Sequence, residues 1–151
     1  MASALIFRNA RRALAVAALA VAALGCGRLE RECRSVTTRA NQFIAEGERN
    51  RPKVASTPAN TAREALDTAA RYDRLAADLA AVEIGTSELR AEVDRYRALA
   101  ERSAASLRAV ARALSDSDFD TARRKRVELA AATEKEELPL VAKINEICGH
   151  R

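Results

Sequence analysis

Apolar residues recur along this chain at the spacing of one face of a helix. The pattern is clearest between Leu89 and Leu114, where the steps alternate between four and three residues and only Ser103 is polar. The positions are Leu89, Val93, Tyr96, Ala100, Ser103, Leu107, Val110 and Leu114. Such a spacing keeps one side of a helix turned towards a partner, as in a coiled coil. The segment predicts a helix about 40 Å long, with Thr86 or Ser87 as its N-cap.

Two weaker amphipathic segments precede this helix. The first runs from about Leu29 to Glu48 and is followed by Arg51–Pro58, in which two prolines predict a loop. The second begins at Thr61, which forms a capping-box pattern with Glu64, and stops near Gly85. Its expected buried face consists of Leu66, Ala69, Tyr72, Ala76, Leu79 and Val82.

A fourth helix is expected from about Phe119 towards the C-terminus. Its apolar positions are poor around Thr133–Glu137, and Pro139 predicts a kink because proline removes an amide donor and crowds the preceding turn. The connections between the second, third and fourth helices are short, which favours antiparallel neighbours. The sequence therefore predicts an all-α fold, an up-down-up-down four-helix bundle preceded by a cleaved signal helix.

The composition agrees with this pattern. The 151 residues are 48% hydrophobic but only 3% aromatic, without Trp, so the core must consist mainly of aliphatic side chains on helices. A chain of this length and apolar content is expected to fold as one domain, and disorder is excluded.

The first 25 residues have the plan of a secretory signal. Three arginines, Arg8, Arg11 and Arg12, precede an uncharged run, Ala13–Leu24, and a small residue, Gly25, follows. Twelve residues rise only about 18 Å as a helix, which is too short for a permanent transmembrane anchor.

The block Ala22–Cys26 closely resembles the lipobox of bacterial lipoproteins, with Leu24 as a mild departure. The resemblance implies that residues 1–25 are removed as a signal peptide, that Cys26 carries the lipid, and that residues 26–151 form the mature domain. A plain secreted protein and an ordinary cytosolic cysteine are the alternatives. Gly27 follows the cysteine in place of the Asp that in some bacteria retains lipoproteins at the inner membrane, so the resemblance favours the outer membrane.

Removal of the leader would lower the net charge of the chain. The leader holds three of the 26 basic residues and none of the 21 acidic ones, so the mature chain keeps 23 against 21 and a net charge of about +2. A role in nucleic-acid binding therefore loses its main support.

The two remaining cysteines, Cys33 and Cys148, are expected to form a disulfide. Both lie on apolar stripes, and an even number of antiparallel helices brings the two chain ends together in an oxidising compartment. A buried pair of free thiols is the alternative. A metal site is disfavoured because two isolated thiols 115 positions apart, without a CxxC pair, do not make a zinc site.

Three clusters of charged residues are candidate binding sites, but a structural role is favoured for each. The alternate acids Asp116, Asp118 and Asp120 resemble half of a calcium loop but lack its Gly and its closing Glu, so they are expected to stabilise a helix N-terminus. The basic run Arg123–Arg126 could bind anionic polymers or lipid headgroups, but a solvated helix surface is favoured. Ion pairs on the helix surface are expected among Glu134, Glu136, Glu137, Lys135 and Lys143.

The inventory of catalytic groups is thin. The sole His is His150, next to the C-terminus, and the only Met is Met1, so axial haem ligands are lacking. No ExxH pair or GxSxG motif occurs, and nothing selects a catalytic pair among the acids. We therefore expect no enzyme, no cofactor and no metal.

These observations favour a lipid-anchored module of the cell envelope, facing the periplasm or attached to the outer membrane, that binds or organises an envelope protein partner. Contact is expected at the distal tip, formed by Arg51–Asn60 and Ser115–Asp118. The alternative is a carrier of small molecules or lipids with a pocket at the loosely packed Thr133–Glu137.

Overall fold

In the computed structural model, residues 27–49 and 57–149 are described, and no described residue lies in a strand. The leader, Cys26 and His150 lie outside these ranges. An N-terminal helix occupies residues 27–49. The later elements are α2 (Pro58–Ala80), α3 (Ser87–Ser115), α4 (Phe119–Ala132), a π-helical turn (Thr133–Glu137) and α5 (Leu138–Ile147). The all-α prediction is confirmed.

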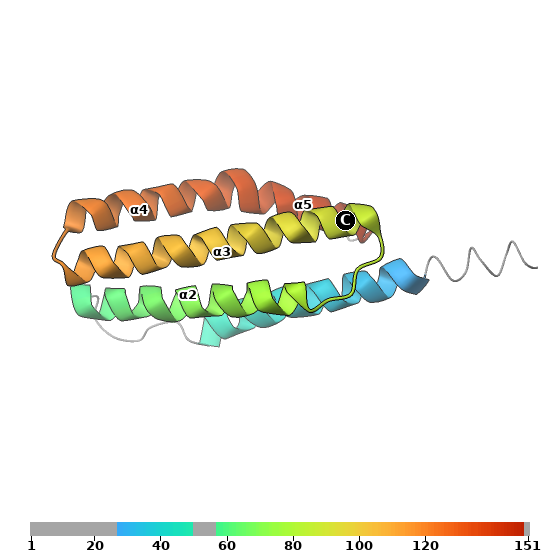
Figure 1. Cartoon of the computed structure of the whole chain (residues 1–151), viewed down its shortest axis with the longest axis horizontal. Coiled ribbons are helices and arrows are strands. Elements are labelled where there is room, and N and C mark those ends of the chain that lie inside the picture. Colours follow the sequence, from blue (N-terminus) through green and yellow to red (C-terminus); the bar gives the residue numbers. More distant parts are fainter. Residues whose placement is uncertain (1–26, 50–56, 150–151) are drawn as a thin grey trace, which may run out of the picture.

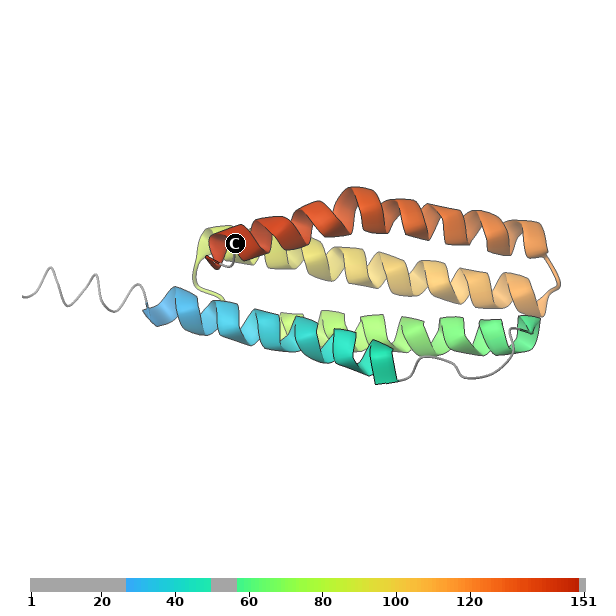
Figure 2. The ribbon, with the colours of Figure 1, turned by 180° about the vertical axis from the view of Figure 1, so that it is seen from behind.

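The helices lie side by side along the long axis of the molecule. α3 lies between α2 and the last helical segment, and the N-terminal helix lies beside α2 (Figures 1 and 2). The connection 81–86 lies at one end, which we call the base, and the turn 116–118 lies at the other, which we call the tip (Figure 1). The N-terminal helix begins at the base and ends well before the tip (Figure 2).

The larger hydrophobic cluster fills the base half. Leu75, Leu79 and Leu89 are almost completely buried in it, and Ile144 joins them from α5. The other buried members are Cys33, Val36, Ala76, Ile84, Val93, Tyr96, Leu99 and Ala100. The stripe expected on α3 is confirmed, with Leu107 and Leu114 only partly buried.

The tip half has a smaller cluster of smaller side chains. It consists of Ala62 and Ala65 from α2 and Val110 and Ala111 from α3. In α4 only Ala122 is buried. Because buried apolar area is the main source of stability, the tip half is held less firmly than the base half.

The start of α2 differs from the sequence-based prediction. Thr57 is the N-cap, and its hydroxyl accepts the Asn60 amide at 3.2 Å. Pro58 is the first helical residue, a position that suits proline because its missing N–H has no partner there in any case. The predicted cap at Thr61 is therefore wrong, and so is the assignment of Pro58–Asn60 to a loop.

The expected burial of Leu66 is also wrong, since this side chain is 51% exposed. Leu75, which was not on the expected stripe, is buried instead. The reason is that α2 turns Ala62, Ala65 and Ala69 towards its neighbours, and Leu66 lies on the adjacent side of the helix.

The irregularity expected near Pro139 takes the form of a π-helical turn just before it. The amide of Leu138 donates to the Thr133 carbonyl, five residues earlier. Such a turn widens the helix by one residue and separates the proline ring from the preceding carbonyls. The ribbon bulges where α4 passes into α5 (Figure 2).

Candidate functional site

The structure brings Cys33 and Cys148 together, as the sequence predicts. Their sulfur atoms lie 2.00 Å apart and their Cα atoms 5.6 Å apart. Cys33 is buried in the base cluster, and Cys148 packs against that cluster from the end of α5. The pair links the first and last described helices at the base.

The acidic cluster between α3 and α4 includes a helix cap. The carboxylate of Asp118 accepts the backbone amide of Thr121 at 3.0 Å, and this hydrogen bond lowers the pKa of Asp118. The described residues contain no group of three or more His, Cys, Asp or Glu side chains that could hold a metal ion. Asp118 thus has the capping role that its position indicates.

The basic run at residues 123–126 lies on the surface of α4, with Lys125 paired to Glu128 at 2.7 Å. The expected pairing of Lys143 with the acids of the π-helical turn is wrong. Lys143 instead pairs with Glu146 at 3.1 Å and lies 3.8 Å from Glu88.

The acids of the π-helical turn reach across to α3. Glu136 pairs with Arg102 at 2.6 Å, and Glu137 accepts the hydroxyl of Tyr96 at 3.4 Å. Burial, together with the charge of Glu137, raises the pKa of Tyr72 to about 12 and also raises the pKa of Tyr96. Both phenols therefore stay protonated at physiological pH.

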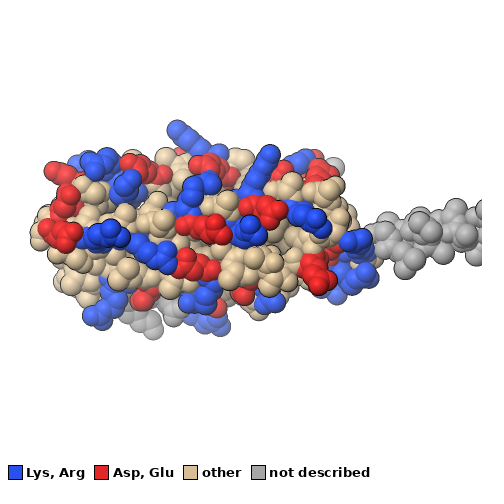
Figure 3. All heavy atoms as spheres, viewed as in Figure 1, with Lys and Arg blue, Asp and Glu red and all other residues tan. Residues whose placement is uncertain are grey.

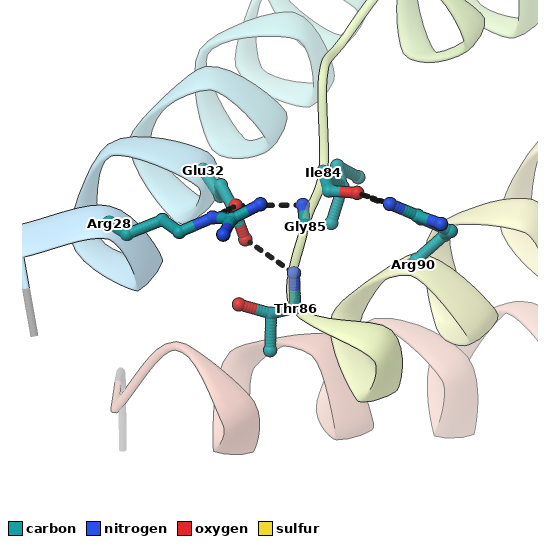
Figure 4. A network of polar contacts seen from close by, with 6 residues as sticks. All are labelled: Arg28, Glu32, Ile84, Gly85, Thr86 and Arg90. Carbon is teal, nitrogen blue, oxygen red and sulfur yellow. Dashed lines mark hydrogen bonds and ion pairs between the residues drawn. The ribbon is translucent and has the colours of Figure 1, made fainter. Parts of the chain in front are cut away.

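A buried carboxylate that sequence patterns did not reveal connects the N-terminal helix to the connection before α3. Glu32 is only 6% exposed. It accepts the amide of Gly85 at 2.8 Å, the amide of Thr86 at 3.2 Å and the guanidinium of Arg28 at 2.8 Å (Figure 4). Beside it, Arg90 donates to the Ile84 carbonyl at 2.8 Å.

These contacts explain the ionisation of Glu32. Burial raises the pKa of the carboxyl group, but the hydrogen bonds from Gly85, Thr86 and Arg28 outweigh it and lower the pKa from 4.5 to about 2. Glu32 is therefore ionised at physiological pH. A methyl group at Gly85 would have to displace the Arg28 guanidinium, which is the end of a flexible side chain, from its place beside Glu32.

Next to this network, a groove of about 770 Å³ runs between the N-terminal helix and the first turns of α3. We call it the base groove. Its lining is mostly polar and includes the arginines Arg28, Arg31, Arg39, Arg90 and Arg97. Sequence reasoning missed it because these arginines come from two segments about 60 residues apart.

The tip carries a different surface, which we call the tip surface. A groove of about 470 Å³ lies between α3 and α4 and is lined by Leu114, Phe119, Ala122, Arg123, Arg126, Val127 and Ala130. Phe119 is 55% exposed and Val127 is 63% exposed. These two apolar side chains are eight residues apart and share one face of α4, with arginines beside them.

A third groove, of about 550 Å³, lies between α3 and α5 beside the π-helical turn. Leu99, Pro139 and Leu140 form its apolar part, and charged side chains surround them. It is open to solvent and lies next to the segment from which a pocket was expected.

Neither the family models, nor the curated proteins, nor the solved structures with which the chain was compared give a match. No helix within the described ranges has both the length and the apolar character needed to cross a membrane.

Proposed function

We propose that this chain is a lipid-anchored protein of a bacterial cell envelope that binds an envelope protein through its tip. In this proposal residues 1–25 are removed, Cys26 carries the lipid, and the mature helices form an up-down-up-down bundle. The resemblance of Ala22–Cys26 to a lipobox supports the anchor. The positions of the connections 81–86 and 116–118 at opposite ends support the order of the helices (Figure 1).

The observation that carries the binding role is the tip surface. Exposed apolar side chains close to one another are typical of interaction sites, whereas scattered ones are ordinary. Phe119 and Val127 meet this description, because both line one groove with Leu114. α3 rises about 43 Å along its 29 residues, so the tip surface lies far from a membrane that holds the base.

A short tether fits this arrangement. Helical structure is already present at residue 27, and Cys33 is joined to Cys148. A lipid on Cys26 would therefore hold the base close to the bilayer, and a partner across the envelope would meet the tip first.

Photo-crosslinking in cells tests the binding role. A photoreactive amino acid at position 119 is expected to crosslink a defined envelope protein, and the variant Phe119→Ser/Val127→Ser is expected to lose capture of that protein. Ile44→Ser/Leu138→Ser is the matched control, because Ile44 and Leu138 are about as exposed but lie outside the tip surface. Equal capture by the two double variants would reject the tip surface.

Mass spectrometry of the native N-terminal peptide tests the anchor. The expected peptide begins at a lipid-modified Cys26, and Cys26→Ser is expected to release the protein to the soluble fraction or leave it unprocessed. An unmodified Cys26 within an uncleaved leader would contradict the anchor.

The groove beside the π-helical turn supports an alternative function as a carrier of small molecules or lipids. Its volume of about 550 Å³ falls in the range of small-molecule sites, and its apolar part is flanked by charges. Native mass spectrometry of the protein purified from its own envelope distinguishes the two functions. A retained small molecule that is lost in Leu140→Trp would favour the carrier.

A further inference from the structure

The charges of the base groove are unbalanced. Of its five arginines, Arg28 pairs with Glu32, and Arg97 lies 3.5 Å from Asp94. The other three, Arg31, Arg39 and Arg90, have no carboxylate partner among the described residues. One acid of the lining, Glu83, likewise has no cationic partner within the described ranges. The groove therefore keeps a net excess of about two positive charges.

The arrangement of these arginines suits an anion that enters between two walls. Arg31 and Arg39 come from the N-terminal helix, and Arg90 comes from α3 on the other side. The bond from Arg90 to the Ile84 carbonyl holds that guanidinium in place without neutralising it (Figure 4). Guanidinium groups bind phosphate oxygens through paired N–H donors, which makes them well suited to a phosphate group.

The Glu32 carboxylate does not neutralise Arg31, Arg39 or Arg90. It is buried, and its oxygens are already bonded to Arg28, Gly85 and Thr86. In Figure 3, basic atoms lie at the extreme base end of the face shown, with an acidic group directly beside them.

We infer that the base groove binds the phosphate headgroup of an anionic phospholipid of the membrane that anchors the chain. This inference rests on the proposed anchor at Cys26, because the anchor places Arg28 and Arg31 within a few residues of the bilayer surface. Basic residues beside a membrane anchor each contribute about a fivefold gain in affinity for anionic lipid. Headgroup binding would fix the rotation of the helices about the anchor, and so the direction in which the tip surface faces.

Arginine modification of the membrane-bound full chain tests the inference. The protein is reconstituted into phosphatidylcholine vesicles with or without phosphatidylglycerol and treated with phenylglyoxal, and each arginine is followed by peptide mass spectrometry. Modification of Arg31 and Arg39 is expected to slow about fivefold when phosphatidylglycerol is present. Arg63 and Arg112 are controls, because both are exposed and lie at the tip end of α2 and α3.

A pair of matched variants keeps the test specific to the groove. Arg31→Gln/Arg39→Gln is expected to abolish the lipid-dependent protection of Arg90 on the opposite wall, whereas Arg63→Gln/Arg112→Gln is expected to leave it unchanged. Equal modification in both kinds of vesicle, or equal protection of Arg63 and Arg112, would overturn the inference.

A third sample separates the lipid from free phosphate. Inorganic phosphate is added to the phosphatidylcholine vesicles, and protection as strong as that from phosphatidylglycerol would show a site for free phosphate and overturn the assignment to lipid. The N-terminal peptide from the native envelope reports separately whether Cys26 carries a lipid. A failure of the anchor is therefore distinguishable from a failure of the groove to bind headgroups.

Discussion

At the scale of single residues, Glu32 contributes more to the fold than its place in the sequence suggests. A buried carboxylate is costly unless its oxygens are hydrogen-bonded, and here two backbone amides and one guanidinium meet that need. The contacts fix the N-terminal helix to the connection between α2 and α3. Without them, Gly85 and Thr86 would lose their acceptor.

Glu32→Gln should destabilise the protein, because a neutral amide retains the shape but loses the charge-assisted hydrogen bonds. The expected loss is about 2 kcal/mol in the free energy of unfolding, measured by denaturant titration at neutral pH. Glu30→Gln is the matched control, since Glu30 is exposed and pairs with Arg34 one turn away. Equal losses in the two variants would contradict the role assigned to Glu32.

The pH dependence of stability should also reveal Glu32. Its pKa in the fold, about 2, lies below the unfolded value of 4.5, so its stabilisation is complete above pH 4.5 and declines as the pH falls towards 2. The difference in unfolding free energy between wild type and Glu32→Gln is therefore expected to shrink over this interval. A difference that stays constant from pH 7 to pH 2 would contradict the lowered pKa.

At the scale of elements, the π-helical turn sets the rotation of α5 relative to α4. A π-helical turn amounts to one extra residue in an α-helix, and the helix after it resumes its own spacing. Ile144 and Cys148 pack in the base cluster, and Glu136 and Glu137 of the turn contact Arg102 and Tyr96 on α3.

Deletion of Lys135 should therefore be tolerated. Removal of one residue from the turn lets it close as an ordinary α-helical turn and leaves the faces of α4 and α5 in place. Deletion of the exposed Ala105 from α3 is the control, because it rotates all later residues of that helix by about 100°. Thermal unfolding should show a nearly unchanged midpoint for the first deletion and a large decrease for the second.

The elements with the strongest periodic pattern in the sequence were predicted best. The stripe of α3 and the weak segment before Pro139 were predicted, because both are local properties of one helix. The helix start at Thr57 and Pro58 was missed because a polar residue followed by proline occurs both in loops and at the N-terminus of helices. The sequence alone does not distinguish the two. The base groove could not be predicted, because its arginines come from two different helices. The apolar stripe of one helix does not show how that helix is rotated relative to another.

At the scale of the whole molecule, stability is distributed unevenly between base and tip. The base holds the leucine-rich cluster, the Glu32 network and the joined cysteines, whereas the tip cluster consists of three alanines and one valine. The proposed binding surface lies in the less firmly packed half, where adjustment to a partner costs less free energy.

Cys33→Ser/Cys148→Ser should lower the thermal midpoint by about 15 °C. The link closes a loop of more than 100 residues, which stabilises the fold by about 4 kcal/mol in the chain-entropy account. Differential scanning calorimetry of the wild-type and double-variant proteins provides the measurement, with reduced wild type as a control. A shift of only a degree or two, or free thiols in protein expressed in the periplasm, would contradict this role.

The link between Cys33 and Cys148 also has a mechanical consequence. Along the chain, Ser117 at the tip is about 90 residues from Cys26, but the path through the sulfurs is only about 40 residues long. A partner that pulls on the tip could thus move it to at most about 140 Å from a fixed Cys26, instead of about 300 Å. Beyond that extension the load falls on covalent bonds, so the link sets the greatest distance at which the anchor and a bound partner can separate without breaking the chain.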